Sequence, residues 1–429
     1  MKSLLLKKIL FLLIIIFFGL QLNSKIIYGQ HFSQLSQSDQ CIKCHMETET
    51  MPKNFNESDI HLQAGLSCVG CHGGDSTKDD VETAMNPLKG FIGVPSREKI
   101  PQLCGKCHTK IDFMRKYQPR IATDQLSQYY SSVHGKKFRQ NDKKVAECVN
   151  CHTAHSIFPA SDPRSSVYSL NVPKTCRKCH SNSVYMKEYA IPTDQFEVYS
   201  LSVHGEALLK KKDIGAPACN DCHGNHGATP PGIASVSYIC GSCHINNMEF
   251  FKQTRMARAF EGLNFHGCEQ CHGYHSIQKA SDTFVGVSES SVCLKCHVSG
   301  DKGFQAAQEI GNQITTLVNV YNAAQMKLLE VQKKGMNDEE INFTLQEAKQ
   351  NLIQSRTLVH TFDPNKVSIK SQEGITKAKN AIEFAEKEID EYYTRRNGFA
   401  AATLAFLVLA IALYFKIKEK EKNKTTSNS

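Results

Sequence analysis

Eighteen cysteines constrain this chain of 429 residues more than any other feature. All of them fall into nine C-x-x-C pairs, and a histidine directly follows the second cysteine of every pair. The pairs are Cys41/Cys44, Cys68/Cys71, Cys104/Cys107, Cys148/Cys151, Cys176/Cys179, Cys219/Cys222, Cys240/Cys243, Cys268/Cys271 and Cys293/Cys296. The histidines that follow them are His45, His72, His108, His152, His180, His223, His244, His272 and His297.

The C-x-x-C-H spacing has a specific chemical use. The two thiols add to the vinyl groups of a haem, and the adjacent histidine becomes the proximal ligand of its iron. A disulfide framework or a set of zinc ribbons would also use many cysteines, but neither requires a histidine after each pair. Histidine supplies only 18 of the 429 residues, yet it occupies this position in all nine pairs. We therefore predict nine covalently attached c-type haems as the cofactors.

Nine histidines lie outside the motifs, so the number of spare histidines equals the number of predicted haems. This equality favours a second, distal imidazole on each iron. The candidate distal ligands are His31, His61, His134, His155, His204, His226, His266, His275 and His360. Met114 and Met186, each six residues after a motif histidine, are alternative axial ligands, but we interpret them as packing residues of helix faces.

The haem-bearing stretch contains internal repeats. Ser132-Val133-His134-Gly135 follows Asp124 at the same spacing at which Ser202-Val203-His204-Gly205 follows Asp194. Each block predicts one short helix that begins at the Asp and ends at the His-Gly pair. Two motifs follow each block, and the first of the two often has another histidine three residues on. We therefore divide residues 30–300 into one single-haem lead and four two-haem repeats.

The fold class follows from this density of motifs. With nine haems between Cys41 and His297, the haems themselves would form much of the hydrophobic core. We expect a mainly α protein with long loops and little sheet. From residue 301 the pattern changes, because apolar residues recur at spacings of three and four through residue 396. This predicts a helical bundle or stalk in which Asn337 and Glu340 form a capping pair. The bundle is a spacer in one interpretation, and in another His360 reaches back to a haem.

Both ends of the chain indicate export. Residues 1–29 combine early lysines with an apolar run and resemble a signal peptide, with an uncleaved anchor as the alternative. Residues 397–416 are apolar enough for one transmembrane helix, and residues 417–429 form a lysine-rich tail. The lysine excess predicts a cytoplasmic tail, with the haem domain on the periplasmic face of the membrane.

The formal net charge of +9 does not indicate a nucleic-acid partner. Part of this charge lies in the signal and the tail, and each haem would add two propionates against a ferric centre of about +1. We therefore expect the protein with its haems to be near neutral or acidic.

The C-x-x-C-H pairs with an extra histidine, as in Cys222-His223-Gly224-Asn225-His226, resemble the paired-motif periplasmic multihaem c-type cytochromes, here with a membrane anchor. The resemblance covers about residues 31 to 300. It implies closely packed, bis-histidine haems that act as a wire. We expect this wire to transfer electrons between a quinol-linked membrane subunit and soluble periplasmic carriers. The alternative is a multihaem reductase of the nitrite or hydroxylamine type with one open haem. We expect an electron-transfer protein rather than a catalyst, because the distal histidines suffice for every iron.

Overall fold

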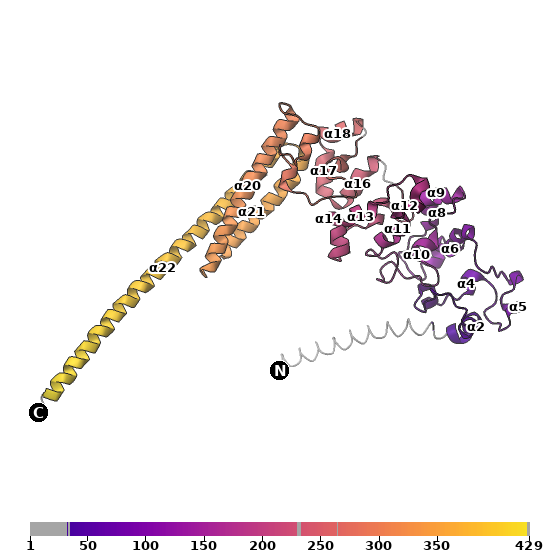
Figure 1. Ribbon diagram of the computed structural model, residues 1–429, viewed down its shortest axis with the longest axis horizontal. Coiled ribbons are helices and arrows are strands. Elements are labelled where there is room, and N and C mark those ends of the chain that lie inside the picture. Colours follow the sequence, from indigo (N-terminus) through magenta and orange to yellow (C-terminus); the bar gives the residue numbers. More distant parts are fainter. Residues whose placement is uncertain (1–31, 33–34, 230–232, 264, 427–429) are drawn as a thin grey trace. The chain divides into compact units, whose positions relative to one another are not determined.

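The computed structural model describes residues 32, 35–229, 233–263 and 265–426 (Figure 1). The predicted signal segment 1–29 and the candidate ligand His31 lie outside the described residues. The described residues form helices joined by loops, and no strand occurs among them. The prediction of a mainly α fold with little sheet is therefore confirmed.

The chain divides into two compact units. The N-terminal unit comprises residues up to 232 together with residues 273–278, and the C-terminal unit comprises residues 233–272 and 279–429. The helices of the N-terminal unit are α2 (Gln40–Glu47), α3 (Ile60–Gln63), α4 (Val69–His72), α5 (Val81–Ala84), η1 (Pro87–Lys89), η2 (Arg97–Lys99), α6 (Ile100–His108), α7 (Ile111–Met114), α8 (Gln125–Ser131), α9 (Val133–Arg139), α10 (Cys148–His152), α11 (Val172–His180), α12 (Ser183–Met186), η3 (Lys187–Tyr189), α13 (Gln195–Ser200), α14 (Val203–Gly205), η4 (Glu206–Lys210) and α15 (Cys219–His223). Those of the C-terminal unit are α16 (Ile233–Cys243), α17 (Ile245–Lys252), α18 (Arg255–Gly262), α19 (Gly267–His272), η5 (Asp282–Phe284), η6 (Val292–Lys295), α20 (Lys302–Lys333), α21 (Glu339–Leu358), η7 (Val359–Thr361) and α22 (Pro364–Thr426).

Side-chain caps define many of the short helices in the N-terminal unit. The Asp39 carboxylate accepts from the backbone N–H of Ile42 at 3.2 Å, and Asp80 accepts from Thr83 at 2.8 Å. Each cap satisfies a backbone donor that the first turn of a helix leaves without a partner. These caps allow helices of one or two turns to begin at fixed positions between long loops.

The prediction of a single helix from Asp124 to Gly135 is wrong, because two helices occupy this range. α8 ends at Ser131, and Ser132 begins a new helix, α9, by accepting from the backbone N–H of Gly135 at 2.9 Å. Gly135 is not a C-terminal cap but a point of close approach, since a Cβ there would lie 1.9 Å from the Tyr129 carbonyl oxygen. The break places His134 in the first turn of α9.

The second repeat contains the same break. Ser202 begins α14 and accepts from the backbone N–H of Gly205 at 3.0 Å. A Cβ on Gly205 would again lie 1.9 Å from a carbonyl oxygen, that of Tyr199. The repeated turn thus places His204 at the position that corresponds to His134.

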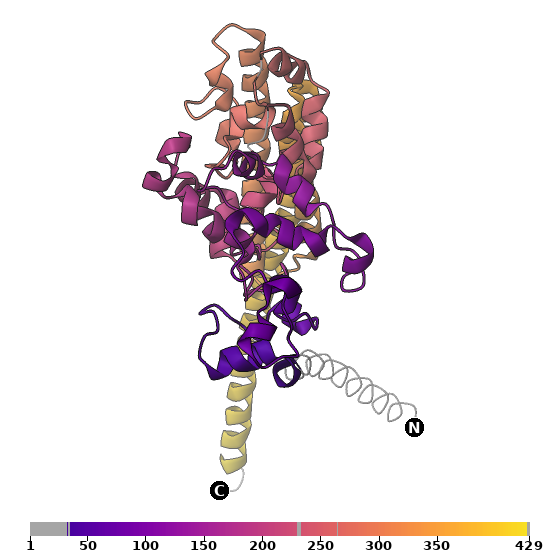
Figure 2. The same cartoon turned by 90° about the vertical axis from the view of Figure 1, so that its right-hand side faces the viewer.

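Three long helices, α20, α21 and α22, form a bundle in the C-terminal unit, and α22 runs on beyond the other two (Figure 1 and Figure 2). The apolar residues predicted to line the seams are largely the ones that are buried. The main buried cluster consists of Ala324, Val331, Ile341, Leu345, Ala348, Ala378, Ala381, Ala385 and Ile389. Alternating large and small side chains let the helices pack closely.

The predicted capping pair of α21 differs in detail from the structure. Asn337 accepts from the backbone N–H of Glu339 at 3.2 Å, and the helix begins one residue later than a cap at Asn337 would require. Glu340 is consequently the second residue of the helix, where its side chain is not placed to complete the box.

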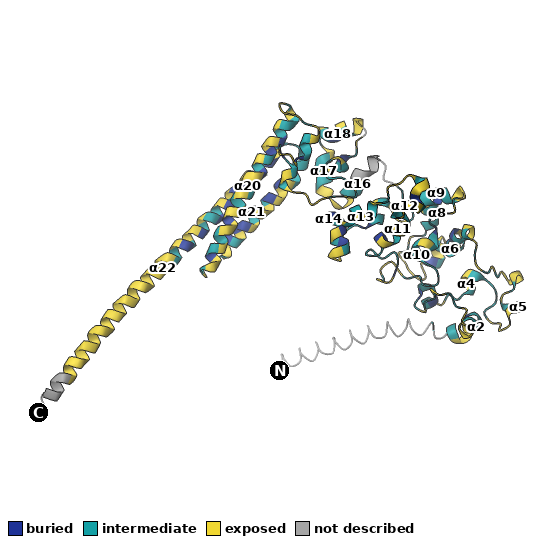
Figure 3. Cartoon of the chain, in the orientation of Figure 1, coloured by how far each residue is buried: buried dark blue, intermediate teal, exposed yellow. Residues whose placement is uncertain are grey.

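Residues 393–421 of α22 are exposed (Figure 3). An 18-residue window of this helix has a mean hydropathy of 2.3, and none of that window is buried. The run from 398 to 415 is therefore long and apolar enough to cross a membrane.

Leu317 tests the packing of the bundle, because its side chain is fully buried between α20, α21 and α22. We expect Leu317→Ala to lower the free energy of unfolding of the bundle by about 2–5 kcal/mol through the cavity that it leaves. Denaturation of the detergent-solubilised protein, followed by circular dichroism, measures this change.

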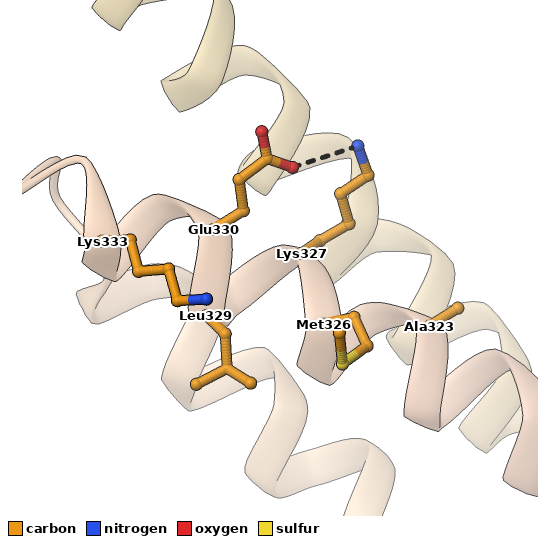
Figure 4. A pocket seen from close by; sticks show the side chains of 6 residues that line it. All are labelled: Ala323, Met326, Lys327, Leu329, Glu330 and Lys333. Atoms are coloured by element: carbon orange, nitrogen blue, oxygen red, sulfur yellow. Dashed lines mark ion pairs between the residues drawn. The ribbon is translucent and has the colours of Figure 1, made fainter.

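Leu329 on the same helix is the matched control. It is 47% exposed and lines a shallow surface hollow with Met326 and Lys333 (Figure 4). Leu329→Ala should change the free energy of unfolding by less than about 0.5 kcal/mol. Equal effects of the two substitutions would contradict the assignment of Leu317 to the core.

Candidate haem-binding site

Eight of the nine C-x-x-C-H motifs lie on or at the end of an α-helix. Residues three apart on a helix share one face, so both thiols of such a motif point to the same side. The ninth motif differs, because Cys293 lies on the short 3-10 helix η6, whereas Cys296 lies just beyond the end of that helix in a non-helical conformation with φ −129°. All eighteen cysteines are among the described residues, and no disulfide joins any of them.

The structure brings the rings of six motif histidines close to those of six histidines from outside the motifs. The distances between ring centroids are 6.0 Å for His72–His155, 6.1 Å for His108–His61, 5.9 Å for His152–His226, 6.1 Å for His180–His134, 5.9 Å for His223–His275 and 6.1 Å for His272–His360. Every pair thus joins a predicted proximal histidine to a predicted distal one.

These distances suit two imidazoles that share one metal ion. A metal–imidazole bond is about 2 Å long, so two rings on opposite sides of one ion have centroids about 6 Å apart. Direct stacking of two rings would allow a closer approach, and the angles between the ring planes range from 11° for His72–His155 to 87° for His61–His108. The common feature is the separation, as axial ligation requires. The residues therefore fit haem iron.

Several of these imidazoles are oriented by backbone carbonyls. The Nδ1 atom lies 2.7 Å from the Gly93 oxygen in His72, 3.3 Å from the Thr229 oxygen in His223 and 3.0 Å from the Thr357 oxygen in His360. A carbonyl accepts from Nδ1–H and leaves Nε2 as the free lone pair for a metal.

Three other imidazoles face carboxylates instead. Nδ1 of His61 lies 3.2 Å from Asp59, and Nδ1 of His297 lies 3.2 Å from Asp301. Nδ1 of His266 lies 2.5 Å from Glu269. These carboxylates were not predicted from the sequence, although each lies within four residues of its histidine.

Burial keeps many of these histidines neutral. Burial, with smaller contributions from the nearby His226 and His108, lowers the pKa of His152 to about 4. Burial also lowers the pKa of His134 and His360, with smaller effects from neighbouring groups. The neutral imidazole is the form that binds a metal, so the surroundings favour ligation over protonation.

Thiols of consecutive motifs lie close together. The Cys104 thiol is hydrogen-bonded to Cys148, and this contact together with burial raises the pKa of Cys148. The same relation holds for Cys176, whose pKa is raised by its contact with Cys219 and by burial. Motif three therefore contacts motif four, and motif five contacts motif six.

Other motifs are linked by weaker electrostatic effects between thiols. Burial raises the pKa of Cys41, Cys71, Cys151 and Cys271, and thiols of the next motif add to the increase. These effects join motif one to two, two to three, four to five, and eight to nine. Motifs one to six thus follow one another in chain order within the N-terminal unit.

Cys44 and Cys107 have fewer contacts with other motifs than the remaining predicted attachment cysteines described above. Both are half-buried free thiols on α2 and α6, and each is the second cysteine of its motif. Their carbonyls accept from the backbone N–H groups of Thr48 and Lys110, each at 2.9 Å.

Neither of these two thiols is hydrogen-bonded to another motif within the described part of the chain. The thiols that make such bonds, as in Cys104–Cys148, are the first cysteines of their motifs and lie one helical turn earlier. The Cys107 thiol has only a weaker effect, because it adds to the increase in the pKa of Cys71. Haem attachment at Cys44 and Cys107, as at the other motif cysteines, stays a prediction from the motif spacing.

Three predicted histidine ligands and the two methionines considered as alternative ligands lie outside the pairs and contacts described above. His45 ends the motif on α2, and His204 and His244 make contacts beyond those described above. Met114 and Met186 are buried, with exposures of 8% and 5%, as expected of packing residues.

Two families of known proteins match parts of the chain. The family described as cytochrome c3 matches residues 60–181, and the family described as cytochrome c554 and c-prime matches residues 22–73 and 239–320. No curated protein and no solved structure matches the chain. The first family match spans motifs two to five, and the second spans the first two motifs and the last three. With its C-x-x-C-H motifs and these matches, the chain is a multihaem c-type cytochrome, a class of proteins that transfer electrons through covalently bound haem.

Proposed function

We propose that this cytochrome carries nine haems and passes electrons between a quinol-linked membrane partner and soluble periplasmic carriers. The observation that carries this proposal is the set of six histidine pairs with centroids 5.9–6.1 Å apart. An iron with two imidazole ligands has no open position for a substrate. Haem supplies a reversible one-electron Fe(III)/Fe(II) couple when bound, and six-coordinate ligation restricts it to that role.

Two rules describe which histidines pair. The histidine of the first motif in a two-haem repeat pairs with the extra histidine of the following repeat, as in His72–His155. The histidine of the second motif pairs with the histidine that precedes the first motif of the same repeat, as in His180–His134. The second rule would also assign His266 to His297, and His31 stays a candidate distal ligand for His45.

Close thiols support a path that follows the chain order. Each thioether sulfur would sit at a haem edge, so hydrogen-bonded thiols of two motifs imply neighbouring haem edges. Cys104–Cys148 and Cys176–Cys219 are such contacts. Electrons would therefore pass from one haem to the next without long gaps in the run from motif one to motif six.

The helical bundle supplies a ligand in this proposal. His360 lies in η7, between α21 and α22, and its ring faces His272. We keep the division into residues 1–29, 30–300, 301–396, 397–416 and 417–429, but the haem site extends into the bundle. The bundle is then more than a spacer.

The exposed apolar end of α22 supports a membrane anchor. Lys416, Lys418 and Lys420 follow the apolar run, which favours a cytoplasmic tail and a haem domain on the periplasmic face. The run from 398 to 415 contains no histidine and no acidic residue. It therefore offers no haem ligand or proton carrier in the bilayer, and quinol oxidation would require a partner subunit.

The first prediction concerns stoichiometry. We expect the purified protein to carry nine haems, because all nine motifs are complete. Intact-mass spectrometry and the pyridine haemochrome assay count them independently. A cytochrome with seven or fewer haems would contradict the reading of every motif as occupied.

The second prediction concerns ligation. His360→Ala should leave all haems attached, because the thioethers and His272 remain, but one iron should become five-coordinate. This iron should bind carbon monoxide when reduced, at one carbon monoxide per protein, and optical titration measures it. Thr361→Ala is the matched control, since the Thr361 hydroxyl contacts backbone groups, donating to the Leu358 carbonyl at 2.7 Å and accepting from the Asp363 N–H at 3.3 Å. It should not open an iron.

The unmutated protein distinguishes the two functional classes in the same assay. Little or no carbon monoxide binding is expected if every iron has two imidazoles. Stoichiometric binding at one haem would contradict the bis-histidine proposal and favour a reductase of the nitrite or hydroxylamine type.

The third prediction concerns topology. A reporter fused after Lys424 should be cytoplasmic, and truncation before Arg395 should release a soluble haem protein, because α22 provides the anchor. Reporter activity on the two sides of the membrane measures the orientation. An exported tail would refute the proposed orientation.

A further inference from the structure

The site of motif three, where His61 pairs with His108, differs from the other paired sites in what its distal imidazole faces. Nδ1 of His61 lies 3.2 Å from the Asp59 carboxylate. The structure describes both rings of all six pairs, and among these rings only His61 forms an ion pair with a carboxylate. At the second site, Nδ1 of His72 faces the neutral Gly93 carbonyl instead. A full negative charge therefore lies beside one proposed axial ligand of the third iron.

The Asp59 carboxylate is held in place by backbone groups as well as by the imidazole. Asp59 is buried, and its Oδ1 atom accepts from the backbone N–H of His61 at 2.8 Å. Its Oδ2 atom accepts from the backbone N–H of Ile157 at 2.6 Å. The carboxylate cannot turn away from the His61 ring without leaving buried donors unpaired.

Asp59 also joins α3, which carries His61, to the loop that carries His155, the distal imidazole of the second site. The Ile157 carbonyl in this loop accepts from the backbone N–H of Ile60 at 2.8 Å. Burial and the paired histidine lower the pKa of His155, and the Asp59 carboxylate opposes them. The charge of Asp59 thus reaches the second site through space and the third site through a hydrogen bond.

A carboxylate affects an axial imidazole more strongly than a carbonyl does. It draws the Nδ1 proton toward itself, which makes Nε2 a better electron donor to the metal. A more basic ligand stabilises Fe(III) relative to Fe(II), so the reduction potential falls. Hydrogen bonding to the ligands is one of the ways in which a protein sets that potential.

We infer that Asp59 is a positioning residue that orients His61 and lowers the reduction potential of the iron that His61 and His108 would hold. The inference rests on the proposed function, because it takes this pair as the two axial ligands of one iron. The same charge lowers the potential of the second iron by a smaller amount, since no hydrogen bond links it to His155. An electron on the third haem would therefore leave with a larger driving force than a neutral residue at position 59 would give it.

Two neutral variants test this inference in the holoprotein. Asp59→Asn and Asp59→Ser each remove the charge and keep a side chain that caps a helix. His61→Ala identifies the third haem, because it should convert one low-spin signal in the electron paramagnetic resonance spectrum to high spin. Redox titration followed by this spectrum should show the third haem at a more positive potential in both neutral variants, with a larger shift than at any other haem.

Asp80→Asn is the matched control. Asp80 also caps a short helix, since it accepts from the backbone N–H of Thr83 at 2.8 Å, but it is exposed and pairs with no imidazole in the described part of the chain. Asp80→Asn should shift no haem. A double-mutant cycle then tests the route of the effect, because Asp59→Asn should shift the third haem much less when His61 is already alanine.

Three results would overturn the inference. One is an unchanged potential of the third haem in both neutral variants, with haem count and circular dichroism retained. Another is a larger shift at a different haem. The third is an undiminished shift in the His61→Ala background, because the charge would then act without the imidazole.

The spectrum of the parent separates this test from the proposed function. A low-spin third haem whose potential stays unchanged in the neutral variants overturns the role of Asp59 alone and leaves the bis-histidine proposal intact. If His61→Ala alters no low-spin signal, His61 is not an axial ligand. The bis-histidine assignment at this iron and the role of Asp59 are then refuted together.

Discussion

The pairing of imidazoles across about 6 Å is the interaction on which the haem region depends, because each pair would be closed by one iron. The two partners come from distant parts of the sequence. His72 meets a histidine 83 positions later, and His152 meets one 74 positions later, as their residue numbers give. An iron held by either of these two pairs would thus join one repeat to the next. Such irons would make the long loops between short helices tolerable, because the ligands, rather than continuous secondary structure, would fix the ends of the loops.

The bundle and the haem region are stabilised in different ways. Of the buried hydrophobic side chains among the described residues, eight lie in the N-terminal unit, namely Ile42, Leu62, Met114, Val145, Val172, Met186, Leu208 and Ala218. Most of the others line the seams of α20, α21 and α22. A unit of this size with so small a core of its own depends on capping hydrogen bonds and on its cofactors. The bundle needs neither, since its helices bury apolar faces against one another.

The sequence predicts the attachment chemistry of the site but not which residues meet across it. The C-x-x-C-H spacing predicts the attachment positions from local chemistry, and apolar residues at spacings of three and four indicate the helical bundle. The pairing of His272 with His360 could not be read in the same way, because it depends on how the chain folds back over many residues. The break at Ser132 was missed for a related reason, since Gly135 is required by contact with the Tyr129 carbonyl rather than by a helix end.

The carboxylates beside the imidazoles could not be predicted from the sequence either. Asp59, Glu269 and Asp301 lie two, three and four residues from their histidines. An acidic residue at such spacings is common on any solvated helix, so the sequence alone does not separate a carboxylate that supports a ligand from an ordinary surface charge. Only the position of the Nδ1 atom makes the distinction.

One helix connects the proposed ligand of haem eight to the proposed anchor. α22 begins at Pro364, just after the turn at Phe362 with φ 51°, and continues to Thr426. A helix rises about 1.5 Å per residue, so the apolar run that begins at Gly398 lies about 50 Å along α22 from the turn that carries His360. If that run spans the bilayer, the eighth haem is held far from a quinol in the membrane by a single rigid element. The length of α22 is therefore itself an argument for a membrane partner whose own cofactors cover this distance.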